Sequence, residues 1–193
     1  MRIRAERAAD QAEVLNLHRL AFGAQDSTHG EQVAGLVSDL RHLVTASAGL
    51  SLVAEMDGTL VGHLMCTPAL VDALPELVTV EVLSPLGVLP RWQRRGVGSA
   101  LVRRAIELLT ARDVPALFLE GDPAYYGRLG FTAGAALGYR RPSLRIPPVA
   151  FQVIQLPAHQ PWMTGTLVYP QVFWDHDLVG LRGERLDRAC RPD

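Results

Sequence analysis

The sequence contains no lysine and only two cysteines among its 193 residues, so all nineteen basic residues are arginine. The absence of lysine excludes the usual P-loop, whose lysine reaches the nucleotide phosphates. Cys66 and Cys190 are too few for a disulfide framework or a cysteine zinc site. The six histidines show no i, i+4 spacing, so the sequence indicates no metal site.

Long apolar runs and excess charge are also missing. No stretch reaches the roughly 18 apolar residues of a membrane span, and residues 1–4 do not open a signal-peptide pattern. A net charge of −1 argues against nucleic acid and anionic membranes as partners. We therefore expect a cytoplasmic protein with one domain over residues 1–193, its core about 1–170 and a C-terminal extension over 171–193.

Hydrophobic periodicity predicts alternating strands and helices. The expected strands are 2–5, 51–56, 59–67, 78–89, 116–120, 151–156 and 164–169, with a hairpin turn at Asp57-Gly58. The expected helices begin at an Asp10–Glu13 capping box, follow an apolar stripe from Val33 to Leu40, span 99–112, and span 123–129 with Asp122 as N-cap, while 22–30 is expected to be a loop.

A glycine turn, Gln93-Arg94-Arg95-Gly96-Val97-Gly98, lies between the apolar run 78–89 and the helical pattern that starts at Ser99. Such a turn directs backbone N–H groups and the positive end of a helix dipole outward, and this arrangement binds phosphate. Leu101 occupies the place of the third glycine in a dinucleotide fingerprint, so that motif does not match. Glycine pairs are common between strands and helices, so the turn alone leaves an ordinary connection equally open.

Two motifs in order resemble the GNAT family of N-acetyltransferases. The glycine turn is similar to the family's acyl-CoA signature, Q/R-x-x-G-x-G/A. About thirty residues later, the segment 125–131 is similar to the aromatic-Tyr-x-x-x-Gly-Phe motif that follows the family's fifth strand. The resemblance covers nearly the whole chain, and the lead-in 121–123 and the tail 165–173 look most like the YhbS-like branch of predicted acetyltransferases.

The resemblance implies the α/β GNAT acyl-CoA N-acyltransferase fold, with a mixed, mostly antiparallel, splayed sheet flanked by helices. It implies acetyl-CoA as the acyl-donor cosubstrate, without a metal. Pro85 is expected to form a bulge that frees backbone groups near Leu86 and Val88 for the pantetheine arm. The residues expected to bind acetyl-CoA are Leu86, Gly87, Val88, Gln93, Arg94, Arg95, Gly96, Val97, Gly98 and Ser99.

Tyr126 aligns with the tyrosine that serves as general acid in many members of the family. A phenol stays protonated at neutral pH and can donate to a thiolate leaving group. Packing of the short helix is the alternative for Tyr126 and for its neighbour Tyr125. The chain has Leu119 where many members carry an asparagine, which leaves the lower cofactor contacts open.

The general base is left open by the sequence. The carboxylates and histidine near the expected site are Glu81, Glu120, Asp122, His29 and Glu31, and a water chain is a further alternative. Glu81 falls one residue out of the register that would point into the cleft, and in a strand that slip reverses the side-chain face.

The expected reaction is transfer of an acetyl group from acetyl-CoA to a primary amine by direct attack, through a tetrahedral intermediate. Two alternatives stay open: a CoA-sensing regulatory module that has lost catalysis, and a transferase for a longer acyl-CoA. The sequence does not identify the acceptor, because acceptor pockets are built from variable loops. A strand-forming C-terminus is compatible with a homodimer.

Overall fold

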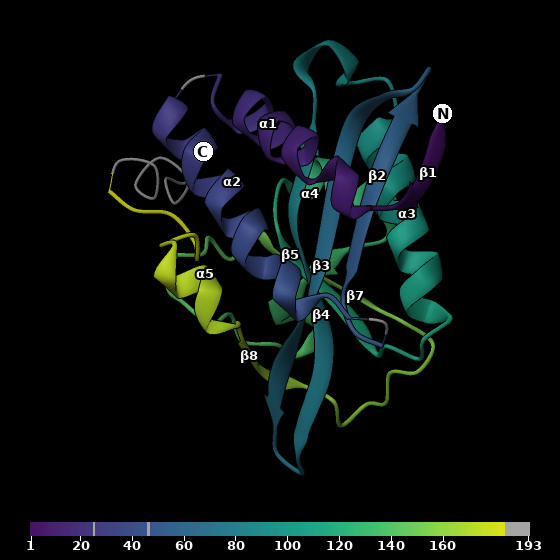
Figure 1. The fold of residues 1–193 in the computed structure, drawn as a ribbon. Helices are drawn as coiled ribbons and strands as arrows, with labels where there is room; N and C mark the ends of the chain where they lie inside the picture. The colour runs from purple at the N-terminus through teal and green to yellow at the C-terminus, as the bar shows by residue number, and fades with distance from the viewer. Residues whose placement is uncertain (25, 46, 184–193) are drawn as a thin grey trace. The chain divides into compact units, whose positions relative to one another are not determined.

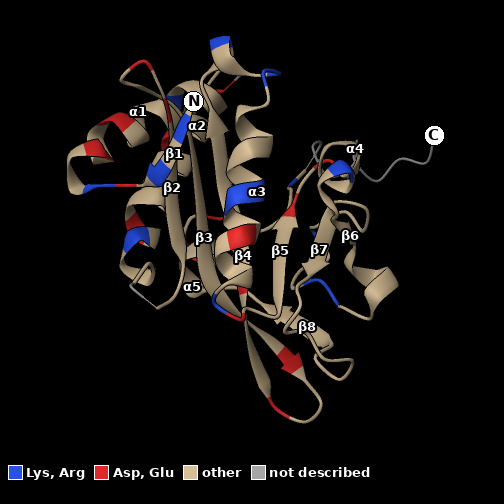
Figure 2. Cartoon of the chain, turned by 90° about the vertical axis from the view of Figure 1, so that its right-hand side faces the viewer, with Lys and Arg blue, Asp and Glu red and all other residues tan. Residues whose placement is uncertain are grey.

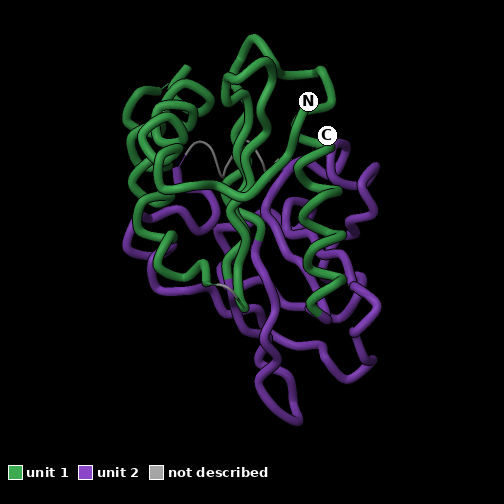
Figure 3. The backbone as a smooth tube through the Cα atoms, turned by 45° about the vertical axis from the view of Figure 1, so that its right-hand side comes forward, with its two compact units in different colours: residues 1–67, 83–112 green, residues 68–82, 113–193 purple. Residues whose placement is uncertain are grey.

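The structure is a computed structural model that describes residues 1–24, 26–45 and 47–183 (Figure 1). The chain forms two compact units, which Figure 3 colours separately. Unit 1 comprises residues 1–67 and 83–112, and unit 2 comprises 68–82 and 113–193. The boundary between the units runs through two strands: β3, Thr59–Ala73, and β4, Leu77–Val88, each have one part in unit 1 and the other part in unit 2.

In unit 1, strands β1, Arg2–Ala5, and β2, Leu50–Met56, pair with each other antiparallel, and β2 pairs with the first part of β3. The predicted hairpin turn joins β2 to β3. Asp57 and Gly58 have positive φ values of 49° and 78°, the left-handed conformations that a tight hairpin turn needs. This local signal was sufficient to predict the hairpin correctly.

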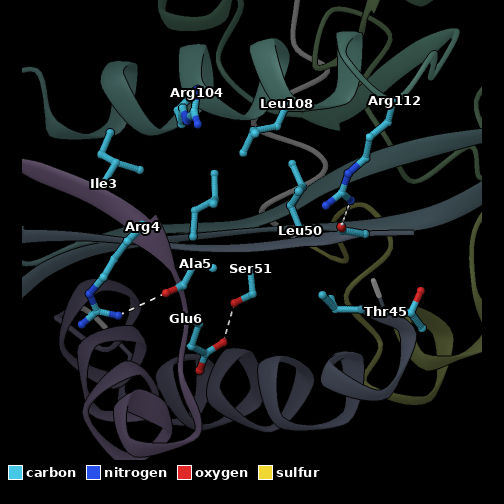
Figure 4. Close-up of a pocket in the computed structure, with 13 residues that line it drawn as sticks. Ile3, Arg4, Ala5, Glu6, Thr45, Leu50, Ser51, Arg104, Leu108 and Arg112 are labelled. Atoms are coloured by element: carbon cyan, nitrogen blue, oxygen red, sulfur yellow. Dashed lines mark hydrogen bonds between the residues drawn. The ribbon is translucent and has the colours of Figure 1, made fainter. Parts of the chain in front are cut away.

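Helices α1, Gln11–Phe22, and α2, Ser27–Leu40, cover one face of these strands and α3, Val97–Thr110, covers the other (Figures 1 and 4). Short 3-10 turns precede α1 at Ala8–Asp10 and follow α2 at Arg41–Leu43. A third such turn, Pro90–Trp92, lies between β4 and α3. The apolar stripes of the helices supply the core of the unit: Val14, Leu17, Val33, Leu36, Val37, Leu40, Leu101 and Leu109 are all buried.

The predicted capping box at Asp10 and Glu13 is wrong. The Asp10 carboxylate accepts hydrogen bonds from the Arg4 guanidinium at 2.6 Å and from the backbone N–H of Arg7 at 2.7 Å. Glu13 instead accepts the backbone N–H of Leu60 at 3.3 Å. A charged partner outside the helix therefore outcompetes the helix amides for the Asp10 carboxylate.

The predicted loop over residues 22–30 is too long, because α2 already begins at Ser27. The Asp26 carboxylate caps this helix by accepting the backbone N–H groups of Thr28 at 3.0 Å and His29 at 3.4 Å. An aspartate in this position satisfies amides that lack a partner inside the helix.

The predicted start of α3 at Ser99 is two residues late. Gly96, with a left-handed φ of 82°, is the N-cap residue and the helix begins at Val97. Helix α3 packs closely on β3, as the position of Gly62 in β3 shows: a Cβ added there would lie 2.8 Å from Cγ1 of Val97. Strand β4 continues through Pro85, whose bond to Ser84 is cis.

Unit 2 contains the remaining strands: β5, Ala116–Glu120, β6, Thr132–Ala133, β7, Phe151–Gln155, and β8, Gly165–Val168. Strand β5 is parallel to β4 at Glu81 and Val82 and antiparallel to β7, and β6 pairs with β7. Strand β8 pairs with residues 70–73 of β3, so the prediction that this strand ends at residue 67 is wrong. The buried core residues of unit 2 include Phe118, Tyr139 and Phe151.

The helices of unit 2 are short. They are α4, Pro123–Tyr126, the 3-10 turns Gly127–Leu129 and Gly134–Leu137, and α5, Gln171–Asp175. The carboxylate of Asp122 caps α4, as predicted, by accepting the backbone N–H of Ala124 at 2.8 Å.

The strand pairings are mixed and mostly antiparallel, and helices flank the strands, so the predicted fold class is confirmed. Cys66 is buried in β3, whereas Cys190 lies outside the described residues, as does the last part of the expected extension, 184–193. In the part of the chain that the structure describes, no helix has the length and apolarity to cross a bilayer.

Candidate functional site

The glycine turn forms an open cradle of backbone at the start of α3. A Cβ placed on Gly96 would meet no atom within 4 Å, and the left-handed backbone there disfavours any residue that carries one. The first amides of a helix have no partner within the helix and point along its axis. Figure 2 shows basic residues, in blue, in the segment that leads into α3. The turn therefore presents positive charge and approachable backbone together.

The side chains around the turn are partly engaged with one another. The Arg95 guanidinium lies 5.2 Å from the ring centroid of Trp92, and Arg94 and Arg95 are exposed. Nε2 of Gln93 donates to the carbonyl oxygen of Val88 at 3.1 Å. This carbonyl was expected to be open to a ligand, but the glutamine side chain already occupies it and thereby links the turn to the end of β4.

The last residues of β4 lie directly before this turn. Leu86 and Val88 are partly exposed, whereas Gly87 is buried between them. A Cβ on Gly87 would lie 2.8 Å from Nδ1 and Cε1 of His18, which belongs to α1. Glycine at this position therefore allows an imidazole from the helix to contact the strand backbone. The structure brings the ten residues expected to bind acetyl-CoA into one continuous segment of unit 1, from 86 to 99.

Tyr126, the expected general acid, belongs to unit 2. Its ring packs against the backbone of Gly121 and lies edge-on to Tyr125 and Phe131, with centroids 4.8 Å and 5.7 Å away. Burial, and then the neighbouring Tyr125, raise the pKa of Tyr126 above its usual value. The phenol is therefore protonated at neutral pH, as a proton donor must be.

Two of the carboxylates left open as the base, Asp122 and Glu31, have a structural task. Asp122 caps α4, and Glu31 forms an exposed ion pair with Arg19 at 2.9 Å. Glu81 is buried on β4 in register with Leu117 of β5. The His29 ring lies edge-on to Phe22 with a centroid distance of 5.9 Å.

Glu120, at the end of β5, has a pKa near neutrality. Burial raises its pKa to about 7, although hydrogen bonds from the Tyr169 hydroxyl and from the backbone N–H of Gly180, the latter at 3.0 Å, oppose that rise. The residue ends β5, immediately before Gly121. A carboxyl group with this pKa is about half ionised at neutral pH and is a candidate proton carrier.

A cavity of unit 1 lies between strands β1 and β2 and helix α3, and Figure 4 shows it in close-up. It has a volume of about 380 Å³ and is lined by Ile3, Arg4, Ala5, Glu6, Val44, Thr45, Gly49, Leu50, Ser51, Leu52, Arg104, Leu108 and Arg112. Ser51 points at the Glu6 carboxylate and donates to it, and Arg112 donates to the carbonyl of Gly49 at 2.7 Å. Sequence patterns did not indicate this cavity, because its lining comes from segments up to about a hundred residues apart.

Across residues 1–24, 26–45 and 47–183, no group of three or more histidine, cysteine, aspartate or glutamate side chains is arranged to hold a metal ion.

Comparison with known proteins yields one consistent set of relatives. The family model of the acetyltransferase (GNAT) domain matches residues 2–134. The uncharacterized N-acetyltransferase YjhQ of Escherichia coli K12 is 33% identical over 135 residues, which cover 69% of this chain and 71% of that protein. The uncharacterized N-acetyltransferase YhbS of the same strain is 29% identical over 135 residues, or 70% of this chain and 75% of that protein.

Solved structures agree with the sequence comparisons. The crystal structure of the E. coli protein YhbS in complex with CoA has a TM-score of 0.76 and 29% identity, covering 89% of this chain and 91% of that one. A GNAT family acetyltransferase from Brucella melitensis, in complex with acetyl-CoA, has a TM-score of 0.66 and 30% identity over 89% of this chain and 97% of that one.

Proposed function

Because the chain belongs to the GNAT acetyltransferase family and is therefore an acyltransferase, we propose that it transfers the acetyl group of acetyl-CoA to a primary amine. The observation that carries this proposal is the cradle at residues 93–98, with its left-handed Gly96 and the start of α3 directly behind it. The two similar crystal structures contain CoA in one case and acetyl-CoA in the other, which supports the choice of donor.

The residues of the cradle fit a diphosphate. Backbone N–H groups from Gly96 to Ser99 would bind its oxygens, and the exposed guanidinium groups of Arg94 and Arg95 would add positive charge. The backbone of Leu86, Gly87 and Val88 would pair with the pantetheine arm as an added strand does. The family match ends at residue 134, whereas the structural likeness to YhbS covers 89% of the chain, which supports a single acetyltransferase domain that continues into unit 2.

The proposed chemistry needs no covalent enzyme intermediate. The neutral amine attacks the thioester carbonyl carbon, the C–S bond of the tetrahedral intermediate breaks, and Tyr126 donates its phenolic proton to the departing thiolate. Positioning both reactants in one site supplies much of the rate enhancement. A protonated phenol can supply general acid catalysis to a thiolate leaving group.

The cradle is tested by the Gly96→Val variant. A branched side chain at this position would cover the amides, so we expect the Kd for CoA, measured by isothermal titration calorimetry, to rise about tenfold or more, which is 1.4 kcal/mol. Gly58→Val is the matched control. Gly58 also has a positive φ, 78°, and a Cβ there also meets no atom within 4 Å, but it lies in the hairpin turn.

Both variants carry a similar backbone strain, so a comparable loss of stability is expected for the two. Only Gly96→Val should lose CoA affinity. Equal affinities of the two variants for CoA would contradict the placement of the diphosphate at this turn.

The role of Tyr126 is tested by Tyr126→Phe, which removes the hydroxyl and keeps the packed ring. We expect kcat to fall about 100-fold, the lower end of what a general acid contributes, with an unchanged Kd for acetyl-CoA. Tyr125→Phe removes a hydroxyl from the adjacent ring and serves as control. An equal kcat for Tyr126→Phe and the native protein would remove Tyr126 from the mechanism.

A further inference from the structure

A continuous chain of hydrogen-bonding side chains runs through the interior of unit 1. Nε2 of His18 lies 2.7 Å from Nδ1 of His63, and Nε2 of His63 lies 2.9 Å from Oγ of Ser51 and 3.6 Å from Glu6. Ser51 donates to Oε2 of Glu6, and Arg41 donates to Oε1 at 2.7 Å. Both histidines are completely buried, and the Glu6 side chain is 6% exposed.

The charges of these groups follow from their partners. Burial raises the pKa of Glu6, but His63, Arg41 and Ser51 outweigh that effect and bring it to about 2, so the carboxylate is ionised. Burial lowers the pKa of both histidines below the usual value. At neutral pH the titratable groups of this hydrogen-bonded network are therefore one carboxylate, one guanidinium and two neutral imidazoles.

These charges determine where the hydrogens lie. The single hydroxyl hydrogen of Ser51 points to the Glu6 carboxylate, which only accepts, so Ser51 must accept from His63. Neutral His63 then carries its hydrogen on Nε2 and has a bare Nδ1, which accepts from Nε2 of His18. Neutral His18 is consequently left with an unprotonated Nδ1 at the end of this hydrogen-bonded network.

That terminal nitrogen has no hydrogen-bond partner among the described residues, although it is buried. Leaving a buried polar atom unpaired is unfavourable, and such atoms call for an explanation. Nδ1 lies beside Gly87 of β4, where a Cβ would approach it to 2.8 Å. No side chain at position 87 therefore separates the nitrogen from the strand that is proposed to hold the thioester arm.

We propose that His18 is the general base of the acetyl transfer and receives the proton of the acceptor amine on Nδ1. This inference rests on the proposed function and supplies the base that sequence reasoning could not assign. Sequence patterns gave no signal for it, since His18 and His63 are 45 residues apart and each lies in an apolar stretch.

The proton balance of the step is complete. As the amine nitrogen bonds to the thioester carbon it becomes positively charged, and one of its protons passes to Nδ1 of His18. The C–S bond then breaks and the thiolate takes the proton of Tyr126. The imidazolium returns its proton, through solvent, to the tyrosinate, so that the amide, free CoA thiol and the original enzyme remain.

The groups around His18 act on its charge in opposite directions. The charged and titratable groups that act on it are His63 from β3, Glu6 after β1 and Arg41 after α2. Burial, His63 and Arg41 disfavour the imidazolium that forms during the step, and the Glu6 carboxylate favours it. Glu6 and Ser51 also line the 380 Å³ cavity of Figure 4, so the hydrogen-bonded network borders this cavity at the end opposite His18.

The test measures release of CoA thiol from acetyl-CoA by the full chain, with spermidine, tyramine and glycine ethyl ester as amine probes, from pH 6 to 10. His18→Gln keeps an amide that can donate to His63 but lacks a basic nitrogen. We expect kcat/KM at pH 7 to fall at least about 30-fold, with an unchanged Kd for CoA by calorimetry. The deficit should shrink toward pH 10, because hydroxide can then accept the proton of the attacking amine in place of His18.

Two further variants complete the design. His42→Gln replaces an exposed histidine of the same unit and should retain the native rate at every pH. Ser51→Ala removes the acceptor that orients His63 and should give a smaller deficit with the same pH dependence. If His18→Gln does not fold, as judged by circular dichroism and thermal unfolding, Ser51→Ala decides by the same criteria.

The outcomes separate the two proposals. No thiol release by the native protein with any amine would reject the proposed function, and the base assignment with it. An active native protein whose His18→Gln variant stays within twofold at pH 7 would overturn the base assignment alone. A deficit that is constant from pH 6 to 10 would also overturn it, because it would indicate displaced packing and not a missing base.

Discussion

Two buried carboxylates, one in each unit, behave in opposite ways. The pKa of Glu6 in unit 1 is lowered to about 2, and that of Glu120 in unit 2 is raised to about 7. Burial pushes both values upward, so the difference comes from their partners. Glu6 has His63, the Arg41 guanidinium at 2.7 Å and Ser51 as partners, whereas Glu120 has a phenol and a backbone N–H.

The comparison indicates that a set of partners that includes a direct cation compensates for lost hydration of a carboxylate better than a phenol and a backbone N–H do. Arg145 does lower the pKa of Glu120, but its effect is the smallest of those that act on the group, and its guanidinium is paired with Asp177 at 2.9 Å. Unit 1 therefore has a permanent charge in its interior, and unit 2 has one that switches near neutral pH.

The largest effect is expected when the compensated carboxylate is removed. Glu6→Gln leaves the Arg41 guanidinium without its buried counter-ion, and we expect the free energy of unfolding to fall by about 3 kcal/mol. Urea unfolding at pH 7, with an unchanged m-value, measures the loss. Glu31→Gln is the matched control. It breaks an exposed pair with Arg19, in which the side chains are 64% and 43% exposed, and should cost about 0.5 kcal/mol or less. Similar losses for both variants would contradict the compensation argument.

The uncompensated carboxylate should reveal itself in the pH dependence of stability. Because the pKa of Glu120 is raised on folding, its contribution is complete below pH 4.5 and is lost as the pH rises through 7. Glu120→Gln imitates the neutral acid at every pH. The free energy of unfolding of the native protein, minus that of the variant, should therefore fall by about 3 kcal/mol between pH 4.5 and 8.

Taking this difference matters, because other groups titrate in the same range. The lowered pKa values of His18 and His63 give stability that is present above pH 6.5 and is lost on acidification, which opposes the Glu120 contribution. Glu6 adds a loss below pH 4.5. All three contributions are common to the native protein and the variant and cancel. A flat difference curve would show that Glu120 is not perturbed on folding.

The same contrast between local and distant partners explains how far the sequence could be interpreted. The Asp57-Gly58 turn and the Asp122 cap were predicted correctly, because each depends on the residues next to it. Strand β3 was predicted to end at residue 67, since its extension depends on β8, about a hundred residues further along. The Asp10 cap was wrong because Arg4 competes for the carboxylate.

The candidate site divides in the same way. The cradle at Gly96 could be expected from sequence, because a left-handed residue before a helix leaves a local glycine signal. The raised pKa of Glu120 could not be expected, because it depends on Tyr169 and Gly180, 49 and 60 positions away. Likewise, nothing near His18 in the sequence indicates His63. The acyl-CoA-binding residues and Tyr126 stay predictions until the variants above are measured.

The smallest expected effect sharpens the comparison at its weakest interaction, the one between Arg145 and Glu120. Arg145→Met removes the guanidinium charge and keeps an unbranched side chain that can lie against the Trp174 ring, whose centroid is 6.0 Å from the guanidinium carbon. Since Arg145 lowers the pKa of Glu120, we expect the titration midpoint of the Glu120 carboxyl, followed by carbon-13 NMR, to rise above about 7. Tyr169→Phe, which removes a direct hydrogen bond, should raise it further.

Arg128→Met provides the control for this titration, because it removes an exposed arginine of the same unit that does not act on Glu120. The order expected for the midpoint is Tyr169→Phe above Arg145→Met, with Arg128→Met equal to the native protein. This order follows from distance and hydration, since a hydrogen bond to the carboxylate acts directly and a solvated, already paired cation acts weakly. A midpoint that fell in Arg145→Met would mean that Arg145 disfavours the ionised form of Glu120, and the explanation of the two carboxylates by their cations would then be wrong.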